Sequence, residues 1–180
     1  MVNSEHLLRA AAQRIQFNQG MLVPEAVVRY KTGAWTSRWD GKTHDTFRDY
    51  LADLMWVTGS GYATELEIKV SRADWRADRL KGKWGAMPQW ISRFIYVVPQ
   101  SLGIPDFVHE MAGVWHYAPR HDGDYRGHIT IARAPRKIGK EKVPESVKRM
   151  WLLHLHCRFW HQRLYSDKRL PRVSAEQAAA

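Results

Sequence analysis

The sequence predicts an α/β domain, and three stretches of the chain indicate it. Residues 53–70 contain two runs of strand-forming residues around the turn sequence Gly59-Ser60-Gly61, which predicts a β-hairpin. A short helical segment and then the apolar run 92–99 follow, and this strand–helix–strand order indicates a parallel crossover. A long helix is expected from Pro144 to about Tyr165.

The chain before the hairpin predicts one helix and one strand. Ser4 is the expected N-cap of a helix that continues to Ile15, because apolar residues recur at helical spacing between them. A short first strand is expected at 25–30. The polar segment 35–49 is interpreted either as an ordinary surface loop or as an excursion of the sheet that reaches a substrate.

Further elements are expected after the hairpin. Ser71 is the candidate N-cap of a short helix, and the continuous apolar run 92–99 is typical of a buried central strand. Segments 113–118 and 128–132 are rich in strand-forming residues and are expected as two more strands at an edge of the sheet.

Length, charge and cysteine content restrict the class of protein. The 180 residues are expected to form a single domain over 1–173, followed by a disordered tail at 174–180. The formal net charge of +10 favours an anionic partner, and nucleic acid is a better candidate than a membrane surface. The one cysteine, Cys157, allows no internal disulfide and fits a reducing compartment. We therefore expect no membrane span and a cytoplasmic location, which is the host cytoplasm if the chain is phage-encoded.

Three polar residues of the predicted hairpin are candidates for a catalytic site. If the turn is centred on Ser60, positions that sum to 120 face each other, so Asp53 lies opposite Glu67 with Cβ atoms about 5 Å apart. Lys69 lies on the same face, two residues further on. Facing carboxylates repel each other, and a divalent cation such as Mg²⁺ relieves that repulsion. The pattern predicts a metal-dependent phosphodiesterase in which Lys69 orients or deprotonates water, or holds a phosphate.

Basic residues after the hairpin are candidates for phosphate contact. A helix that begins near Ser71 offers its N-terminus to a phosphate, and cations crowd this segment and the basic segment 133–142. The alternative is a solvated helix face on which acids and bases pair, for instance Arg72 with Asp78. The expected nucleic-acid-binding residues are Ser71, Arg72, Arg76, Lys81, Lys83, Arg136 and Lys137.

Two additional sets of metal ligands are weaker candidates. Glu25 precedes the expected first strand and could complete the metal shell of the hairpin, although such a glutamate is more often a strand terminus. His154, Cys157 and His161 share one face of the C-terminal helix and could supply three zinc ligands, although ordinary core or surface histidines are commoner.

The context of Asp53, Glu67 and Lys69 resembles the PD-(D/E)XK nuclease superfamily. Its pattern is an acidic residue at the start of one core strand, Glu-x-Lys on the next, and then a helix and a further strand. The run 67–78 reads Glu-Ile-Lys-Val-Ser-Arg-Ala-Asp-Trp-Arg-Ala-Asp, and it is similar to the branch that contains the MmcB-type DNA repair proteins. The likeness covers about residues 50–135. Ala52 stands where proline usually precedes the acidic residue, and the polar segment 35–49 has no counterpart.

The resemblance implies a restriction-endonuclease-like α/β core with a mixed central sheet flanked by helices. It also implies hydrolysis of DNA phosphodiesters with Mg²⁺ or Mn²⁺. Asp53, Glu67 and the backbone carbonyl of Ile68 would hold the metal, and Lys69 would position or activate water. We therefore expect a DNA endonuclease of replication, recombination or repair that binds DNA. The resemblance leaves the oligomeric state open, with a homodimer as one candidate. The alternative is a non-catalytic nucleic-acid-binding or partner-recruiting subunit on the same fold.

Overall fold

The computed structural model describes residues 2–16, 19–78, 84, 87–120 and 127–166. The chain divides into two compact units, Met1–Pro144 and Glu145–Ala180. The single domain expected over 1–173 stays a prediction, and the tail expected at 174–180 lies outside the described residues. The first unit contains α1 (Ser4–Ile15), β1 (Gly20–Thr36), β2 (Thr43–Thr58), β3 (Ala63–Ile68), α2 (Arg72–Asp78), β4 (Ile91–Pro99), η3 (Gln100–Leu102), β5 (Gly113–Ala118) and β6 (His128–Arg133).

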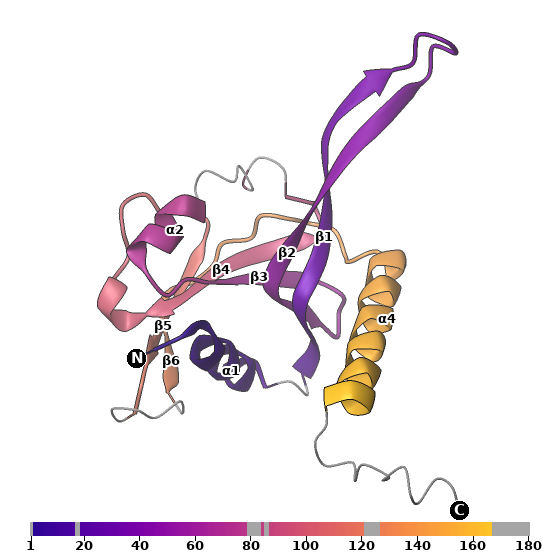
Figure 1. Ribbon diagram of the computed structural model, residues 1–180. Helices are drawn as coiled ribbons and strands as arrows, with labels where there is room; N and C mark the ends of the chain where they lie inside the picture. Colours follow the sequence, from indigo (N-terminus) through magenta and orange to yellow (C-terminus); the bar gives the residue numbers. More distant parts are fainter. Residues whose placement is uncertain (1, 17–18, 79–83, 85–86, 121–126, 167–180) are drawn as a thin grey trace, which may run out of the picture. The chain divides into compact units, whose positions relative to one another are not determined.

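The six strands of the first unit form one mixed sheet in the order β1-β2-β3-β4-β5-β6. β1, β2 and β3 pair antiparallel, β3, β4 and β5 run parallel, and β6 returns antiparallel to β5. The parallel step from β3 to β4 passes through α2, which confirms the expected crossover (Figure 1). The predicted α/β class, with a mixed sheet flanked by helices and a C-terminal helix, is therefore confirmed.

Each face of the sheet has its own apolar core. The stripe of α1 that includes Leu7 and Ile15 packs with Leu66 and Ile95. On the other face, Trp75 of α2 joins a cluster of buried side chains from β4 and β5. Glu65 and Glu67 point to this second face, since successive residues of a strand alternate and Leu66 belongs to the first. The carboxylates of β3 are therefore buried on the side of the sheet that α2 covers.

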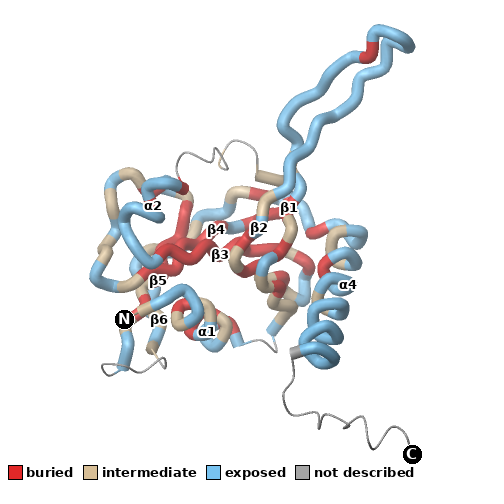
Figure 2. The backbone as a smooth tube through the Cα atoms, viewed as in Figure 1, coloured by how far each residue is buried: buried red, intermediate tan, exposed pale blue. Residues whose placement is uncertain are grey.

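The first two strands are much longer than the sequence predicted. The short strand expected at 25–30 is part of β1, which runs from Gly20 to Thr36 and pairs with β2 along its length. Of the two interpretations of 35–49, the excursion of the sheet is correct, since only 37–42 lies outside the two strands. Most residues of this excursion are exposed (Figure 2), so the alternation of buried and exposed residues that marks a half-buried strand is missing. Pro24 is accommodated because β1 is an edge strand.

The helix boundaries agree with the sequence apart from one cap. α1 spans the predicted residues, but its N-cap is Asn3, whose Oδ1 accepts from the backbone N–H of His6 at 3.0 Å, and not Ser4. Ser71 caps α2 as predicted, because its Oγ accepts from the N–H of Asp74 at 3.1 Å.

The second unit is helical where it is described. It contains α4 (Glu145–His161), and one π-helical turn, η4 (Gln162–Ser166), continues it close to the expected end at Tyr165. Among the described residues, no helix combines the length and the apolar character needed to cross a membrane.

Candidate functional site

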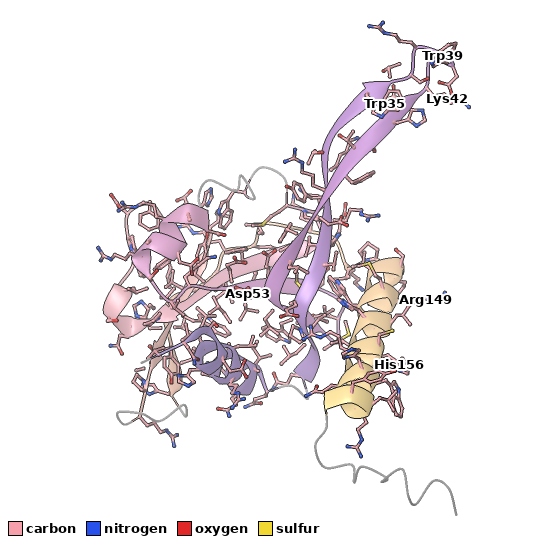
Figure 3. All side chains as sticks on the ribbon, viewed as in Figure 1. Trp35, Trp39, Lys42, Asp53, Arg149 and His156 are labelled. Atoms are coloured by element: carbon pink, nitrogen blue, oxygen red, sulfur yellow. The ribbon has the colours of Figure 1, made fainter. Side chains whose placement is uncertain are left out.

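The register between β2 and β3 is the one that the Gly-Ser-Gly turn predicts. Val57 pairs with Ala63 and Leu54 with Leu66, so paired positions sum to 120. The turn is closed by hydrogen bonds between Thr58 and Tyr62, and Gly61 adopts a φ of 89°, which a glycine accepts without strain. Asp53 directly precedes Leu54 at the base of the long hairpin (Figure 3), and Glu67 directly follows Leu66, the partner of Leu54.

The carboxylate of Asp53 accepts a hydrogen bond from the backbone N–H of Ile68, in place of a backbone carbonyl of β2. The ladder between β2 and β3 ends at Leu54 and Leu66, and the next N–H of β3 on that side belongs to Ile68. This N–H donates to Oδ2 of Asp53 at 2.7 Å. The carboxylate is therefore fixed beside the backbone of Ile68, whose carbonyl is a predicted metal ligand.

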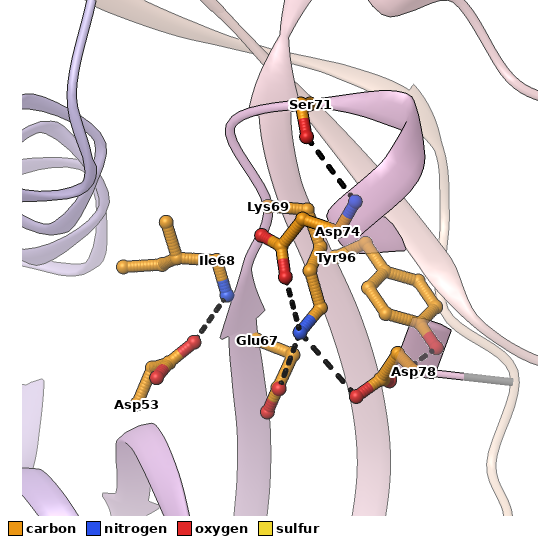
Figure 4. Close-up of polar contacts among 8 residues, drawn as sticks. All are labelled: Asp53, Glu67, Ile68, Lys69, Ser71, Asp74, Asp78 and Tyr96. Atoms are coloured by element: carbon orange, nitrogen blue, oxygen red, sulfur yellow. Dashed lines mark hydrogen bonds and ion pairs between the residues drawn. The ribbon is translucent and has the colours of Figure 1, made fainter. Parts of the chain in front are cut away.

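Glu67 and Lys69 meet at the end of β3. Lys69 Nζ donates to Glu67 Oε1 at 2.8 Å, and each of these residues is only 3% exposed (Figure 4). The ammonium also lies 3.3 Å from Oδ1 of Asp78 and 3.9 Å from Oδ1 of Asp74. Lys69 is thus surrounded by three carboxylates from β3 and α2.

The charge of Lys69 is stabilised by these neighbours. Burial lowers the pKa of Lys69, but the attraction and hydrogen bond of Glu67, together with the charges of Asp78 and Asp74, outweigh burial. The pKa of Lys69 therefore lies above its ordinary value. Lys69 is a protonated donor near neutral pH and not a general base in this state.

Tyr96 connects this cluster to an aromatic pocket. Its hydroxyl donates to Oδ2 of Asp78 at 3.0 Å, and burial followed by the charge of Asp78 raises the pKa of Tyr96. The ring of Tyr96 lines an open pocket of about 680 Å³ together with Trp75, Arg76 and Phe107. The pocket therefore lies on the face of the sheet that carries Glu67.

Asp74 and Asp78 are the two site residues that sequence reasoning missed. The sequence offers Asp78 only as a partner for Arg72. In the structure Asp78 is 4% exposed, forms an ion pair with Lys69 and accepts a hydrogen bond from Tyr96. The usable signal was their spacing, because residues four apart lie on one face of a helix that starts directly after β3.

The donor set suits a hard cation that keeps part of its water shell. Asp53 on β2 and Glu67 on β3 lie next to the paired residues Leu54 and Leu66, and both supply carboxylate oxygens. Ile68, whose N–H donates to Asp53, supplies a backbone carbonyl. Glu25 lies in β1 between Pro24 and Ala26, which pair with Leu54 and Ala52, but it adopts a φ of 51° and has no pair of its own in the ladder.

The described residues support no larger ligand set. Within them, no three or more His, Cys, Asp or Glu side chains are grouped so that they could hold a metal. The roles of Asp53, Glu67 and Ile68 as metal ligands stay predictions, as do Glu25 as a further ligand and the zinc set His154, Cys157 and His161.

The predicted phosphate contacts are divided between two places. Arg72 and Arg76 belong to α2 and lie close in sequence to the Lys69 cluster, with Arg72 donating to the carbonyl of Leu102 and Arg76 lying over the ring of Phe107. The Ser71 hydroxyl is used as the helix cap.

The other predicted contacts are not brought to the cluster. Lys137 lies over the ring of Tyr62 at the opposite end of β3, about 20 Å along the strand from Lys69. Arg136 pairs with Glu110 at 3.4 Å. Lys81 and Lys83 lie outside the described residues.

Comparison with known proteins identifies the fold and not the activity. No protein-family model matches the chain, and no curated protein matches it. The structure is similar to that of SPO1766, a protein of unknown function from Silicibacter pomeroyi, with a TM-score of 0.56 and 18% identity. The likeness covers 91% of this chain and 92% of that one. At this identity the likeness shows a shared fold alone.

Proposed function

We propose that the protein is a metal-dependent DNA endonuclease whose site is Asp53, Glu67 and Lys69. The observation that carries the proposal is the arrangement at the end of β3. There, Asp53 is fixed on the backbone of Ile68 at 2.7 Å, and Glu67 is bonded to Lys69 at 2.8 Å. Two carboxylates, a carbonyl and an ammonium at one strand end match the ligands and the donor that phosphodiester hydrolysis needs.

The two carboxylates and the Ile68 carbonyl would hold Mg²⁺ or Mn²⁺. When bound, such an ion neutralises phosphate charge and lowers the pKa of a coordinated water. Asp53 is suited to this role because the N–H of Ile68 fixes its rotamer before any ligand arrives. Glu67 is suited because the hydrogen bond from Lys69, at 2.8 Å, holds its carboxylate in place.

Lys69 would act as a donor. Although burial lowers the pKa of Lys69, its carboxylate neighbours raise it above the ordinary value, which favours an ammonium that orients the attacking water or neutralises charge on the phosphate. Of the three roles that the sequence left open for Lys69, deprotonation of water is the one that this environment disfavours. The buried contact with Asp78 fixes the direction in which the ammonium points.

The charge of the chain supports DNA as the substrate. The net charge of +10 favours binding to a polyanion, and Arg72 and Arg76 extend from the helix that supplies Asp74 and Asp78. Replication, recombination or repair is the process in which we place the activity.

Nicking of a supercoiled plasmid tests the proposal. We expect open-circular product with Mg²⁺ or Mn²⁺ and none with EDTA, and no product from Glu67→Gln in either condition. Lys148→Ala serves as a matched control, because Lys148 pairs locally with Glu145 in α4. Plasmid binding without metal-dependent nicking would reject the nuclease and favour the non-catalytic binding subunit.

A further inference from the structure

The distal hairpin, residues 29–49, extends beyond the part of the sheet that packs on a core. Between residues 31 and 49 only Ser37 is buried, whereas residues 20–28 of β1 and 52–58 of β2 are mostly buried or half-buried. Figure 3 shows Trp35, Trp39 and Lys42 at the end of this hairpin that is far from Asp53. The distal hairpin therefore offers both of its faces to a partner.

Local contacts give the distal hairpin a defined conformation. Arg29 binds Asp49 through two hydrogen bonds of 2.8 and 3.0 Å, and Lys31 pairs with Asp45 at 2.5 Å. Thr32 donates across the ladder to Thr46. A two-stranded ribbon without a core is marginally stable in water, so these cross-strand pairs are what hold it.

The tip is a closed turn that holds one tryptophan out in solvent. Ser37 exchanges backbone hydrogen bonds with Lys42 and Gly41 at 2.8 and 3.0 Å, and Gly41 adopts a φ of 68°. Asp40 accepts from the N–H of Lys42, and hydrogen bonds from Ser37 and Lys42 lower the pKa of Asp40. Trp39, within this turn, is 99% exposed.

A stacked pair lies next to the tip. Trp35 and His44 face each other across the ladder, with ring centroids 4.9 Å apart and an interplanar angle of 25°. Trp35 is itself 55% exposed. Exposed aromatic rings can stack on the bases of a nucleic acid. The apolar faces of two tryptophans are thus presented to solvent within a few residues.

The charge of the distal hairpin is complementary to a nucleic acid. Each of its acids pairs with a lysine or arginine of the same hairpin: Asp49 with Arg29, Asp45 with Lys31 and Asp40 with Lys42. Arg38 and Arg48 remain as cations for which the described part of the chain supplies no ion-pair partner. Aromatic faces beside arginines are the combination that binds strands with accessible bases.

We infer that the tip of the distal hairpin binds DNA at unpaired bases, with Trp39 stacking on a base and Arg38 contacting a neighbouring phosphate. This surface is separate from the site at the end of β3. It shares the DNA partner of the proposed function but needs neither the metal nor the chemistry. Trp39 is thereby a binding residue and takes no part in catalysis.

Binding to fluorescein-labelled DNA tests the inference, measured by anisotropy with EDTA present so that no cleavage occurs. The probes are one oligonucleotide as a single strand, as a fully paired duplex, and as a duplex with a central bubble. We expect wild-type protein to prefer the single strand and the bubble. Trp39→Ala should weaken binding to both by about tenfold, because stacking of a base on an aromatic ring contributes on the order of 1–3 kcal/mol.

Two variants at the same position separate stacking from other effects. Trp39→Tyr should retain most of the affinity, whereas Trp39→Leu should bind as weakly as Trp39→Ala. The thermal unfolding of all three should match wild type, since the ring contacts solvent and not a core.

The inference is overturned if Trp39→Ala binds the bubble as tightly as wild type, or if Trp39→Leu does. It is also overturned if wild type binds no probe, or if Trp39→Ala changes the oligomeric mass by light scattering, which would assign the tip to a second copy of the chain. A protein that fails to nick plasmid but shows the Trp39 dependence would lose the nuclease proposal and keep this one.

Discussion

The ammonium of Lys69 lies 3.3 Å from Oδ1 of Asp78, and this contact joins the end of β3 to the last residue of α2. Both side chains are almost fully buried. A buried charge that loses its partner is costly, so the pair fixes α2 against the sheet while it orients the ammonium. Stability and the proposed chemistry therefore share this contact.

Asp78→Ala should lower the free energy of unfolding by about 3 kcal/mol, because it removes a buried partner from both Lys69 and Tyr96. Asp74→Ala is the matched control, since the Asp74 side chain is 46% exposed and lies 3.9 Å from the ammonium. Its cost should stay below about 1 kcal/mol. Urea unfolding of both variants measures the difference, and equal losses would contradict the importance given to Asp78.

Lys69→Ala should abolish nicking, and it should also destabilise the fold, because Glu67 and Asp78 would remain as buried carboxylates without the ammonium between them. Lys69→Arg keeps the charge and should retain most of the stability while losing the geometry of the donor. The pair is compared by plasmid nicking and by thermal unfolding. Wild-type nicking by Lys69→Arg at full stability would show that the ammonium geometry is not needed.

The dependence of stability on high pH should report the Lys69 network. The folded protein holds the Lys69 proton more tightly than the unfolded chain, so this contribution is complete below the ordinary lysine pKa of 10.5. It is lost as the pH rises through the higher folded value. Lys69→Arg has no such step, because arginine stays charged.

Urea unfolding of wild type and Lys69→Arg between neutral pH and pH above 10.5 measures this loss. The stability of wild type relative to Lys69→Arg should fall only at the alkaline end. A constant difference across the range would mean that folding does not raise the pKa of Lys69.

Asp53→Asn should separate the structural role of Asp53 from metal binding. The amide oxygen can still accept from the N–H of Ile68, so the free energy of unfolding without metal should change by less than about 1 kcal/mol.

Mn²⁺ should raise the melting temperature of wild type, and this shift should be lost in Asp53→Asn together with nicking. Asp49→Asn, on the distal hairpin, should keep the Mn²⁺ shift. An unchanged shift in Asp53→Asn would remove Asp53 from the ligand set.

The central strands could be predicted from the sequence, because the local turn and strand signals there agree with the tertiary structure. Gly59-Ser60-Gly61 sets the turn and therefore the register, which places Asp53 beside Glu67 without knowledge of any distant contact. The continuous apolar run 92–99 predicts a strand that is buried on both faces, and β4 lies between β3 and β5 as expected. By contrast, the distal hairpin has polar residues on both faces, so its strands leave no periodic signal.

The spacing of Asp74 and Asp78 predicts a shared helix face, but it does not predict that Asp78 is buried against Lys69. Its contact with Lys69 depends on how α2 docks on the sheet, and Trp75 and its neighbours decide that docking. An aspartate in a basic, exposed-looking helix is usually a surface residue, and only the packed structure identifies this one as buried.

The long hairpin separates the two proposed DNA contacts. Asp53 at the base lies eleven positions after Lys42 at the tip, which corresponds to about 35 Å along an extended strand. That distance is close to one helical turn of duplex. If the tip and the site at Asp53 contact the same DNA duplex, the hairpin sets the distance between binding and cleavage. Cuts should then fall at a constant offset of about ten base pairs from the nearest bubble or frayed end.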